Sequence, residues 1–305
     1  MSNELTLKNL KVKYKVMPIR HLQELQEDID ELDQKGKISK NKILRGYIGN
    51  FKFQLPDEFQ EAKYVIALAL ESKVALVNFH YNGVIHEVMI PQNYLSSEVT
   101  EEDITKSILD DVIKEPGYRV ERVRTVHLKL LATRSGLGKY GRNNICYVDE
   151  LGSLVNLFCF YTDYDFNEDN FQEAKMLDEC EKCSICINKC PAQAISQDDF
   201  IIDVEKCITL YNEIEGEFPS WIEADAHNAL IGCMKCQKYC PANKTAIKNT
   251  RRFEDLTEEE TMVILEGKGE EEIVNSIEQK LDMYHPSYVK YCLPILKRNL
   301  RVLLK

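Results

Sequence analysis

Eight of the eleven cysteines of this 305-residue chain fall between residues 180 and 240. The first half of this stretch has the spacing C-x2-C-x2-C-x3-C-P, and the second half ends with C-x2-C-x3-C-P. One further cysteine lies between the two halves. In chain order the eight are Cys180, Cys183, Cys186, Cys190, Cys207, Cys233, Cys236 and Cys240.

This spacing is typical of a module that holds two 4Fe–4S clusters, each by four thiolates. Three cysteines two residues apart can surround one cluster, because the short loop between them bends back on itself. The cysteine before proline points away and ligates the other cluster, and the proline fixes the turn that redirects the chain. Cys207 then replaces the missing first cysteine of the second half. The predicted ligands are Cys180, Cys183, Cys186 and Cys240 for the first cluster and Cys190, Cys207, Cys233 and Cys236 for the second.

Two other uses of clustered cysteines explain the pattern less well. Disulfides are favoured in secreted chains, and this sequence shows no secretory signal. Zinc suits paired C-x2-C motifs, but it accounts neither for the two Cys-Pro endings nor for the x3 gap. No apolar run is long enough to span a membrane, so we expect a cytoplasmic protein with no membrane partner.

The net charge limits the partners of the chain. A charge of −11 and a pI near 5.2 argue against a large phosphate-binding surface. Basic residues do crowd the region from Arg119 to Arg142, which leaves room for a local basic patch.

Outside the cysteine stretch, strand and helix patterns alternate. Apolar residues recur at helical spacing in 20–36, 101–114 and 127–134, and the apolar run 62–70 suits a buried strand. Two further apolar runs flank Asn82-Gly83, which predicts a β-hairpin. We therefore predict an α/β or α+β domain, then a ferredoxin-like double-cluster module and a short helical C-terminus. The predicted domain ranges are 1–165, 166–250 and 251–305. Cys146 and Cys159 fall within predicted strands, where we expect buried core thiols.

A glycine-rich segment at 135–144 is the second informative feature. Gly136, Gly138 and Gly141 allow the backbone to approach a ligand closely, and the following arginine and asparagines add donors. The segment follows a helical pattern rather than a strand, however, so a purely structural turn fits it equally well.

The order of several motifs along the chain is informative. The segment 127–144, the pair Gly152-Ser153, the cysteine stretch with its lone Cys207 and the late Lys297-Arg298-Asn299 follow one another along the chain. In this order they resemble the epoxyqueuosine reductases and, more distantly, the respiratory reductive dehalogenases. The resemblance covers residues 55–305, with motif-level agreement at 127–153 and 180–241 only.

The resemblance implies an oxidoreductase that binds a corrinoid, cobalamin, in its α/β domain beside the two clusters. The sequence departs from the family where Lys139 replaces a tryptophan, and where Asn93-Tyr94-Leu95 replaces an Asp-Tyr-His stretch whose Asp supplies protons. An Asn side chain cannot act as an acid, so Tyr94 is the predicted proton donor; a half-buried structural tyrosine is the alternative. The residues implied to hold the corrinoid are Gly136, Gly138, Tyr140, Gly141, Arg142, Asn143 and Asn144.

Three functions remain open at this point. The first is a cobalamin-dependent reductase of a small molecule or another unidentified substrate. It would receive electrons from a low-potential donor such as ferredoxin or flavodoxin. The second is a ferredoxin-like electron carrier that docks to a partner protein and binds no corrinoid. The third is reduction of epoxyqueuosine in transfer RNA. The acidic charge, and the lack of the family's C-terminal helical repeat domain, argue against transfer RNA as the substrate.

Overall fold

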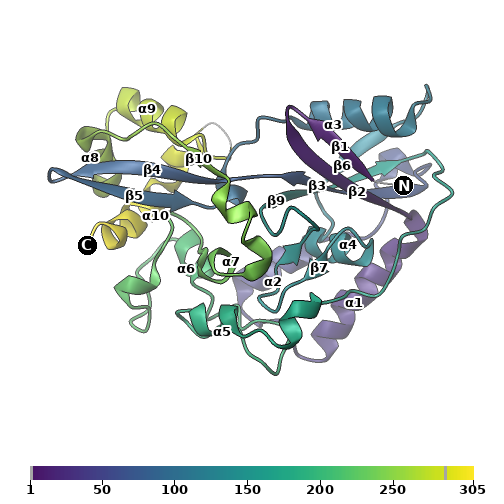
Figure 1. Cartoon of the computed structure of the whole chain (residues 1–305), viewed down its shortest axis with the longest axis horizontal. Helices are drawn as coiled ribbons and strands as arrows, with labels where there is room; N and C mark the ends of the chain where they lie inside the picture. The colour runs from purple at the N-terminus through teal and green to yellow at the C-terminus, as the bar shows by residue number, and fades with distance from the viewer. Residues whose placement is uncertain (1–2, 285–286) are drawn as a thin grey trace. The chain divides into compact units, whose positions relative to one another are not determined.

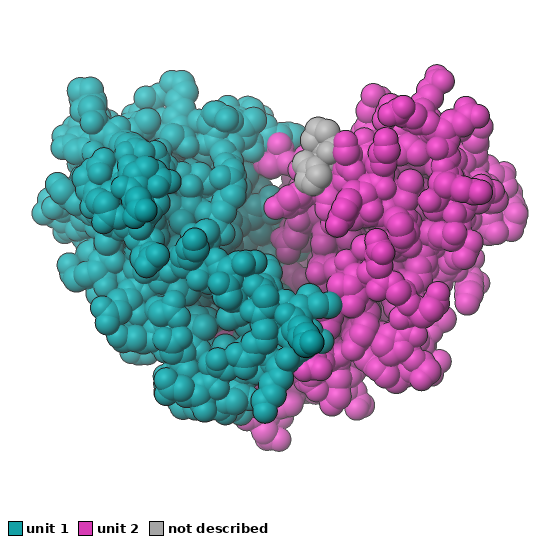
Figure 2. Space-filling model, turned by 180° about the vertical axis from the view of Figure 1, so that it is seen from behind, with its two compact units in different colours: residues 1–72, 98–183 teal, residues 73–97, 184–305 magenta. Residues whose placement is uncertain are grey.

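The computed structural model describes residues 3–284 and 287–305, and its contacts divide the chain into two compact units (Figures 1 and 2). Unit 1 comprises residues 1–72 and 98–183, and unit 2 comprises residues 73–97 and 184–305. These boundaries differ from the three predicted ranges. The physical reason is that the hairpin expected in the N-terminal domain pairs with a strand near residue 250 and packs with the C-terminal helices.

Unit 1 is built on an antiparallel sheet of five strands in the order β1-β2-β3-β9-β6. Each strand is paired with its neighbour in continuous register; Tyr64, for example, lies opposite Thr162. The strands are β1 (Glu4–Leu7), β2 (Leu10–Pro18), β3 (Tyr64–Glu71), β9 (Val155–Thr162) and β6 (Val120–Val123).

Strand β3 is buried on both faces, as the apolar run predicted. The odd-numbered positions from Val65 to Ala69 pack with α1 and α4, and the even-numbered positions from Ile66 to Leu70 pack with α3 and η4. Figure 1 shows helices on both sides of this sheet. The helical segments are α1 (Leu22–Gln34), α2 (Lys42–Gly49), α3 (Glu101–Ser107), the π-helical η4 (Ile108–Ile113) and α4 (Leu128–Arg134).

The glycine-rich segment of unit 1 forms a small two-stranded ribbon. Its strands are β7 (Lys139–Tyr140) and β8 (Cys146–Tyr147), which pair antiparallel directly after α4. Helix α4 begins where the His127 Nδ1 accepts a hydrogen bond from the Leu130 amide.

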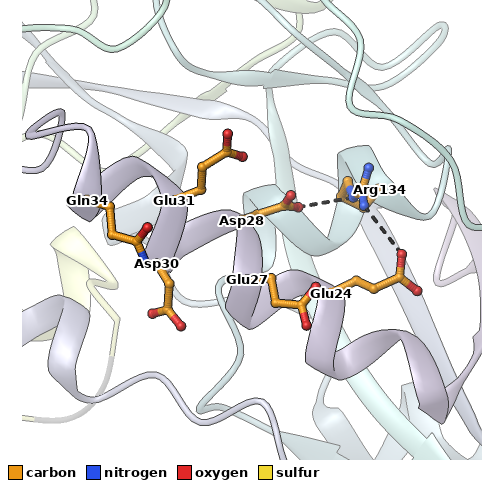
Figure 3. Close-up of a pocket in the computed structure, with 7 residues that line it drawn as sticks. All are labelled: Glu24, Glu27, Asp28, Asp30, Glu31, Gln34 and Arg134. Carbon is orange, nitrogen blue, oxygen red and sulfur yellow. Dashed lines mark ion pairs between the residues drawn. The ribbon is translucent and has the colours of Figure 1, made fainter.

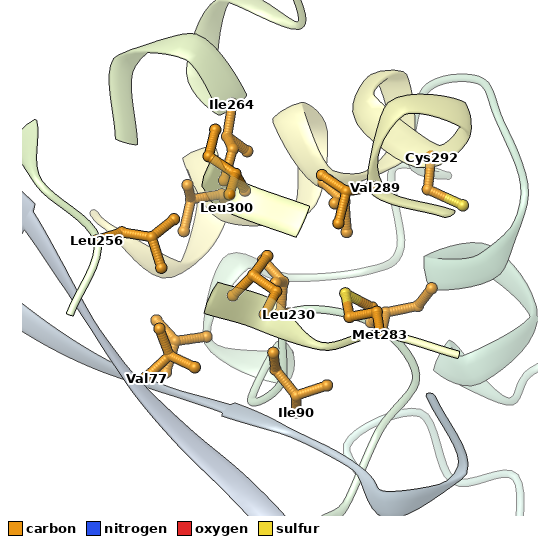
Figure 4. Close-up of a cluster of buried hydrophobic side chains, with 14 of the residues drawn as sticks. Val77, Ile90, Leu230, Leu256, Ile264, Met283, Val289, Cys292 and Leu300 are labelled. Carbon is orange, nitrogen blue, oxygen red and sulfur yellow. The ribbon is translucent and has the colours of Figure 1, made fainter. Parts of the chain in front are cut away.

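Unit 2 combines the predicted hairpin with the C-terminal helices. The strands β4 (Val74–Tyr81) and β5 (Val84–Ile90) pair antiparallel around Asn82-Gly83, and β10 (Thr250–Arg252) adds to β4 in parallel. Side chains of this sheet meet those of α8, α9 and α10 in a single core (Figure 4). The helices are α5 (Ile185–Lys189), α6 (Ile208–Glu213), α7 (Lys235–Lys238), α8 (Glu258–Glu266), α9 (Glu271–Leu281) and α10 (Tyr288–Leu303).

Short 3-10 turns complete the chain: η1 (Ile19–His21), η2 (Asp57–Phe59), η3 (Gln92–Tyr94), η5 (Asp178–Glu181), η6 (Ala224–Ala226), η7 (Pro241–Asn243) and η8 (Ala246–Lys248). The mixed α/β fold with a helical C-terminus confirms the predicted fold class. Within the described residues, none of the helices combines the length and the apolar character that crossing a membrane requires.

Candidate metal centre

The two cysteine motifs of unit 2 are carried by short helices that pack against each other. Helix α5 contains Cys186 and ends just before Cys190, while α7 contains Cys236 and is followed by Cys240. Cys207 is the residue that caps the start of α6. The fold therefore brings together segments up to about 50 residues apart in sequence, as crossed ligation requires.

Three of the four predicted ligands of the second cluster are close enough to interact electrostatically. The thiols of Cys190 and Cys233 both act electrostatically on Cys207, and Cys190 acts on Cys233. Burial raises the pKa of Cys207 and of Cys233, because removal from water disfavours the thiolate. Across residues 3–284 and 287–305, no three Cys, His, Asp or Glu side chains converge as a metal-binding group. Both ligand sets therefore stay predictions.

The sulfurs of the second set receive hydrogen bonds that the sequence did not reveal. Asn228 Nδ2 donates to Cys233 Sγ at 3.2 Å, and the Asn228 Oδ1 accepts from the Met234 amide at 2.8 Å. Thr209 donates to Cys207 from both its backbone and its side chain. The Ala194 amide lies 3.3 Å from Cys190 Sγ. Such donors stabilise thiolate charge, so these residues fit an anionic iron–sulfur centre.

The predicted ligands of the first cluster are divided between the units, because Cys180 and Cys183 belong to unit 1 and the other two to unit 2. Within unit 1, Cys180 is buried and its carbonyl accepts a hydrogen bond from Arg142 at 2.6 Å. Arg142, predicted to hold the corrinoid, thus contacts the backbone of a predicted cluster ligand.

The glycines of 135–144 approach protein atoms closely. A Cβ at Gly138 would lie 2.6 Å from the Cys146 Sγ, and one at Gly141 would lie 2.5 Å from the Tyr147 ring. Only glycine permits this closeness between β7 and its return strand. The contacts favour the structural-turn alternative for these glycines.

Polar groups of the same segment, one side chain and one backbone carbonyl, form hydrogen bonds within unit 1. Asn143 Nδ2 donates to the Tyr147 hydroxyl at 2.9 Å, and the Asn144 carbonyl accepts from Lys129 at 3.0 Å. Arg142 and Asn143 are buried. The space beside Gly136, Gly138 and Gly141 is taken by protein atoms, and the Asn143 amide bonds to Tyr147, so these four residues do not fit a corrinoid cradle. Their role in cobalamin binding remains a prediction from the resemblance.

Tyr94 ends η3 in unit 2 and packs against the residue before Cys233. A Cβ on Gly232 would lie 2.6 Å from the Tyr94 hydroxyl. That hydroxyl donates a hydrogen bond to Glu213 at the end of α6. Burial, followed by the nearby Glu213 carboxylate, raises the pKa of Tyr94 well above its ordinary value. The phenol therefore stays protonated, and Glu213 is a partner that sequence reasoning missed.

The basic residues between Arg119 and Arg142 do not form a positive surface. Arg119 pairs with Glu121, Arg124 with Glu101, and Lys139 with Asp178. The neighbouring Arg134 lies beside an acidic pocket on α1 in unit 1 (Figure 3), where its Nε is 3.1 Å from Asp28. These acidic partners neutralise the charges of Arg119, Arg124, Arg134 and Lys139. The pocket contains none of the predicted site residues.

Comparison with known protein families identifies the class of metal-binding domain in this chain. A family model described as a 4Fe-4S double cluster binding domain matches residues 179–243. The chain therefore carries a double 4Fe–4S cluster domain within a mixed α/β fold, as the cysteine spacing predicted.

Individual related proteins identify the family more closely. Epoxyqueuosine reductase of Staphylococcus aureus is 30% identical over 134 residues, which cover 44% of this chain and 33% of that protein. The solved structure of epoxyqueuosine reductase from Streptococcus thermophilus has a TM-score of 0.65 at 16% identity, over 96% of this chain and 76% of that one. The chain is related to the epoxyqueuosine reductases, which confirms the resemblance seen in its sequence. Its alignment spans only about a third of the Staphylococcus aureus protein.

One further structure corrects a prediction about partners. An epoxyqueuosine reductase solved with a tRNA-Tyr epoxyqueuosine-modified stem loop has a TM-score of 0.62 at 17% identity, over 96% of this chain and 76% of that one. The prediction that transfer RNA is an unlikely partner, and that the substrate is a small or unidentified molecule, is wrong. Net charge averages over the whole surface, and it does not exclude a local site for a polyanion.

Proposed function

We propose that this chain is a cytoplasmic iron–sulfur reductase whose substrate is an epoxide-bearing nucleoside, of the epoxyqueuosine type, within transfer RNA. The observation that carries the proposal is a double 4Fe–4S domain at 179–243 in a chain whose fold matches epoxyqueuosine reductases over 96% of its length. A plain electron carrier is not favoured, because the likeness extends well beyond the cluster domain.

The chemistry suits two one-electron centres. Loss of an epoxide oxygen as water forms a carbon–carbon double bond and consumes two electrons and two protons. Two 4Fe–4S clusters can each deliver one electron, and groups of the protein supply protons. The bonds broken are the two carbon–oxygen bonds of the epoxide.

Cobalamin is part of the proposal because the resemblance implies it. When bound, it would supply a low-potential metal centre able to act on an electrophile. The glycines of segment 136–144 pack closely against protein atoms, so no side chain of that segment is assigned to it. Anaerobic titration of the cluster-loaded protein with cob(II)alamin, followed by paramagnetic resonance, tests this part separately. We expect a saturable one-to-one change in the cobalt signal, and its absence would contradict cobalamin dependence.

The test of the function is turnover. The cluster-loaded protein, reduced with dithionite and supplied with cobalamin, is expected to convert epoxyqueuosine to the olefin in a modified transfer RNA stem loop. Digestion and mass spectrometry of the nucleosides measure the product, and protein stripped of iron is the control. A modified stem loop that stays unchanged with both clusters intact would contradict the proposal.

Tyr94 is the proposed proton donor. We expect Tyr94→Phe to lower the turnover rate by roughly 10²- to 10⁴-fold, because proton transfer of this kind contributes that much. Iron content should stay unchanged, since the ring still packs against Gly232. Tyr81→Phe, at another partly buried aromatic of unit 2, is the matched control. Equal turnover in Tyr94→Phe and the wild type would assign Tyr94 a structural role.

A further inference from the structure

One segment of unit 2 is strongly basic although the chain as a whole is acidic. Residues 235–252 hold six lysines and arginines and no aspartate or glutamate, whereas the chain carries −11. The segment runs from α7 through η7 and η8 into β10. It therefore includes two predicted cluster ligands, Cys236 and Cys240, and directly continues the cluster domain.

The two arginines of this segment are neutralised, but its exposed lysines are not. Arg251 pairs with Asp282 at 2.9 Å, and Arg252 pairs with Glu87 at 2.6 Å. Lys238, Lys244 and Lys248 are exposed, and none of them forms an ion pair with any residue in the described ranges 3–284 and 287–305. These lysines differ from Arg119 and Arg124, whose charges are neutralised by acidic side chains.

An exposed aromatic ring, Tyr239, directly follows Lys238 in the sequence. Tyr239 is 43% exposed, and the Lys189 Nζ of α5 lies 4.8 Å from the centre of its ring. The backbone around it is held in place, because the buried Asn243 donates to the Gln237 carbonyl at 3.0 Å. This bond closes the loop that carries Lys238 and Tyr239.

We infer that Lys189, Lys238, Tyr239, Lys244 and Lys248 form an RNA-docking surface on the cluster domain, here called the lysine–tyrosine surface. The lysines would neutralise backbone phosphates, and an unpaired base would stack on Tyr239. The inference rests on the proposed function, since it names the part of the protein that holds the RNA substrate.

The composition of the surface favours RNA over a protein partner. Lysine is depleted from the cores of protein–protein interfaces, which rely on buried apolar and aromatic anchors. Lysines interleaved with an exposed aromatic ring are typical of single-stranded nucleic-acid sites. An acidic electron-carrier protein is the competing partner, and the test below separates the two.

The test measures binding of the cluster-loaded protein to an unmodified transfer RNA anticodon stem loop by fluorescence anisotropy over a range of salt concentrations. We expect K189A/K238A/K244A to weaken binding at least tenfold at low salt. The slope of log affinity against log salt should become shallower by about two to three, because each phosphate contact contributes about 0.7–0.9. Tyr239→Ala should weaken binding about fivefold or more with little change in slope.

The matched control is K40A/K42A/K268A, which removes the same charge from exposed lysines elsewhere. We expect it to bind within about twofold of the wild type. Iron content and thermal melting establish that every variant is loaded and folded. Equal losses in the two triple variants, or none in either, would overturn the inference.

Two further outcomes are decisive. If K189A/K238A/K244A keeps its RNA affinity but is reduced more slowly by an acidic ferredoxin, the surface belongs to a protein partner and the inference is wrong. If the wild type binds the stem loop through this surface but never converts the modified nucleoside, the inference stands and the proposed function fails.

Discussion

Replacement of Cys207 with alanine is expected to halve the iron content of the loaded protein. Cys207 lies outside both cysteine motifs, and in the predicted ligand set it supplies the fourth thiolate of the second cluster. Its thiol interacts with those of Cys190 and Cys233, two other members of that set. Loss of one of four thiolates from a 4Fe–4S cluster should leave the second site empty or labile. Iron and acid-labile sulfide assays, with paramagnetic resonance of the reduced protein, measure the result.

Cys292→Ala is the matched control for this experiment. Cys292 is also in unit 2 but lies on α10, where it is buried in the same hydrophobic cluster as Val289 (Figure 4). The variant should retain both clusters. A Cys207→Ala protein with full iron and both cluster signals would remove Cys207 from the ligand set and require another fourth ligand.

Replacement of Asn299 with alanine is expected to destabilise unit 2 by about 2–5 kcal/mol, because two buried carbonyls lose their donor. Asn299 is fully buried in α10, and its Nδ2 donates to the Asn212 carbonyl at 2.9 Å and the Leu230 carbonyl at 3.0 Å. Asn212 in turn donates to the Gly232 carbonyl at 2.7 Å. This chain of amides connects the C-terminal helix to the residue before Cys233. The free energy of unfolding in urea measures the effect.

The same substitution should also weaken retention of the second cluster, since metal binding and folding are coupled. Asn93→Ala, at an exposed position of η3 in the same unit, is the control and should change the free energy of unfolding by less than about 0.5 kcal/mol. If Asn299→Ala unfolds at the same urea concentration as this control, the amide chain does not support the cluster domain.

Local sequence patterns were sufficient to predict several of the elements and the class of metal centre. The double-cluster class followed from the spacing of eight cysteines, because ligand geometry is encoded over a few residues. The buried run of β3 and the Asn82-Gly83 hairpin were predicted for the same reason, since strand burial and turn type depend on neighbouring residues. The cap at the start of α8 is also local, because Thr257 and Glu260 bond to each other across three residues.

Tertiary structure decided which elements pair with each other and which charged side chains are neutralised. Only the fold shows that β4 and β5 belong with β10 and the C-terminal helices, because strand pairing joins residues far apart in sequence. Only the fold shows that Gly138 and Gly141 pack against β8. Only the fold shows that Arg119, Arg122 and Arg124 meet acidic partners, while the lysines of 235–248 meet none among the described residues. Composition records the charges of a chain, but neutralisation depends on distances that the fold alone sets. The sequence by itself thus determined the clusters and the class of protein, whereas the available surfaces were decided by long-range packing.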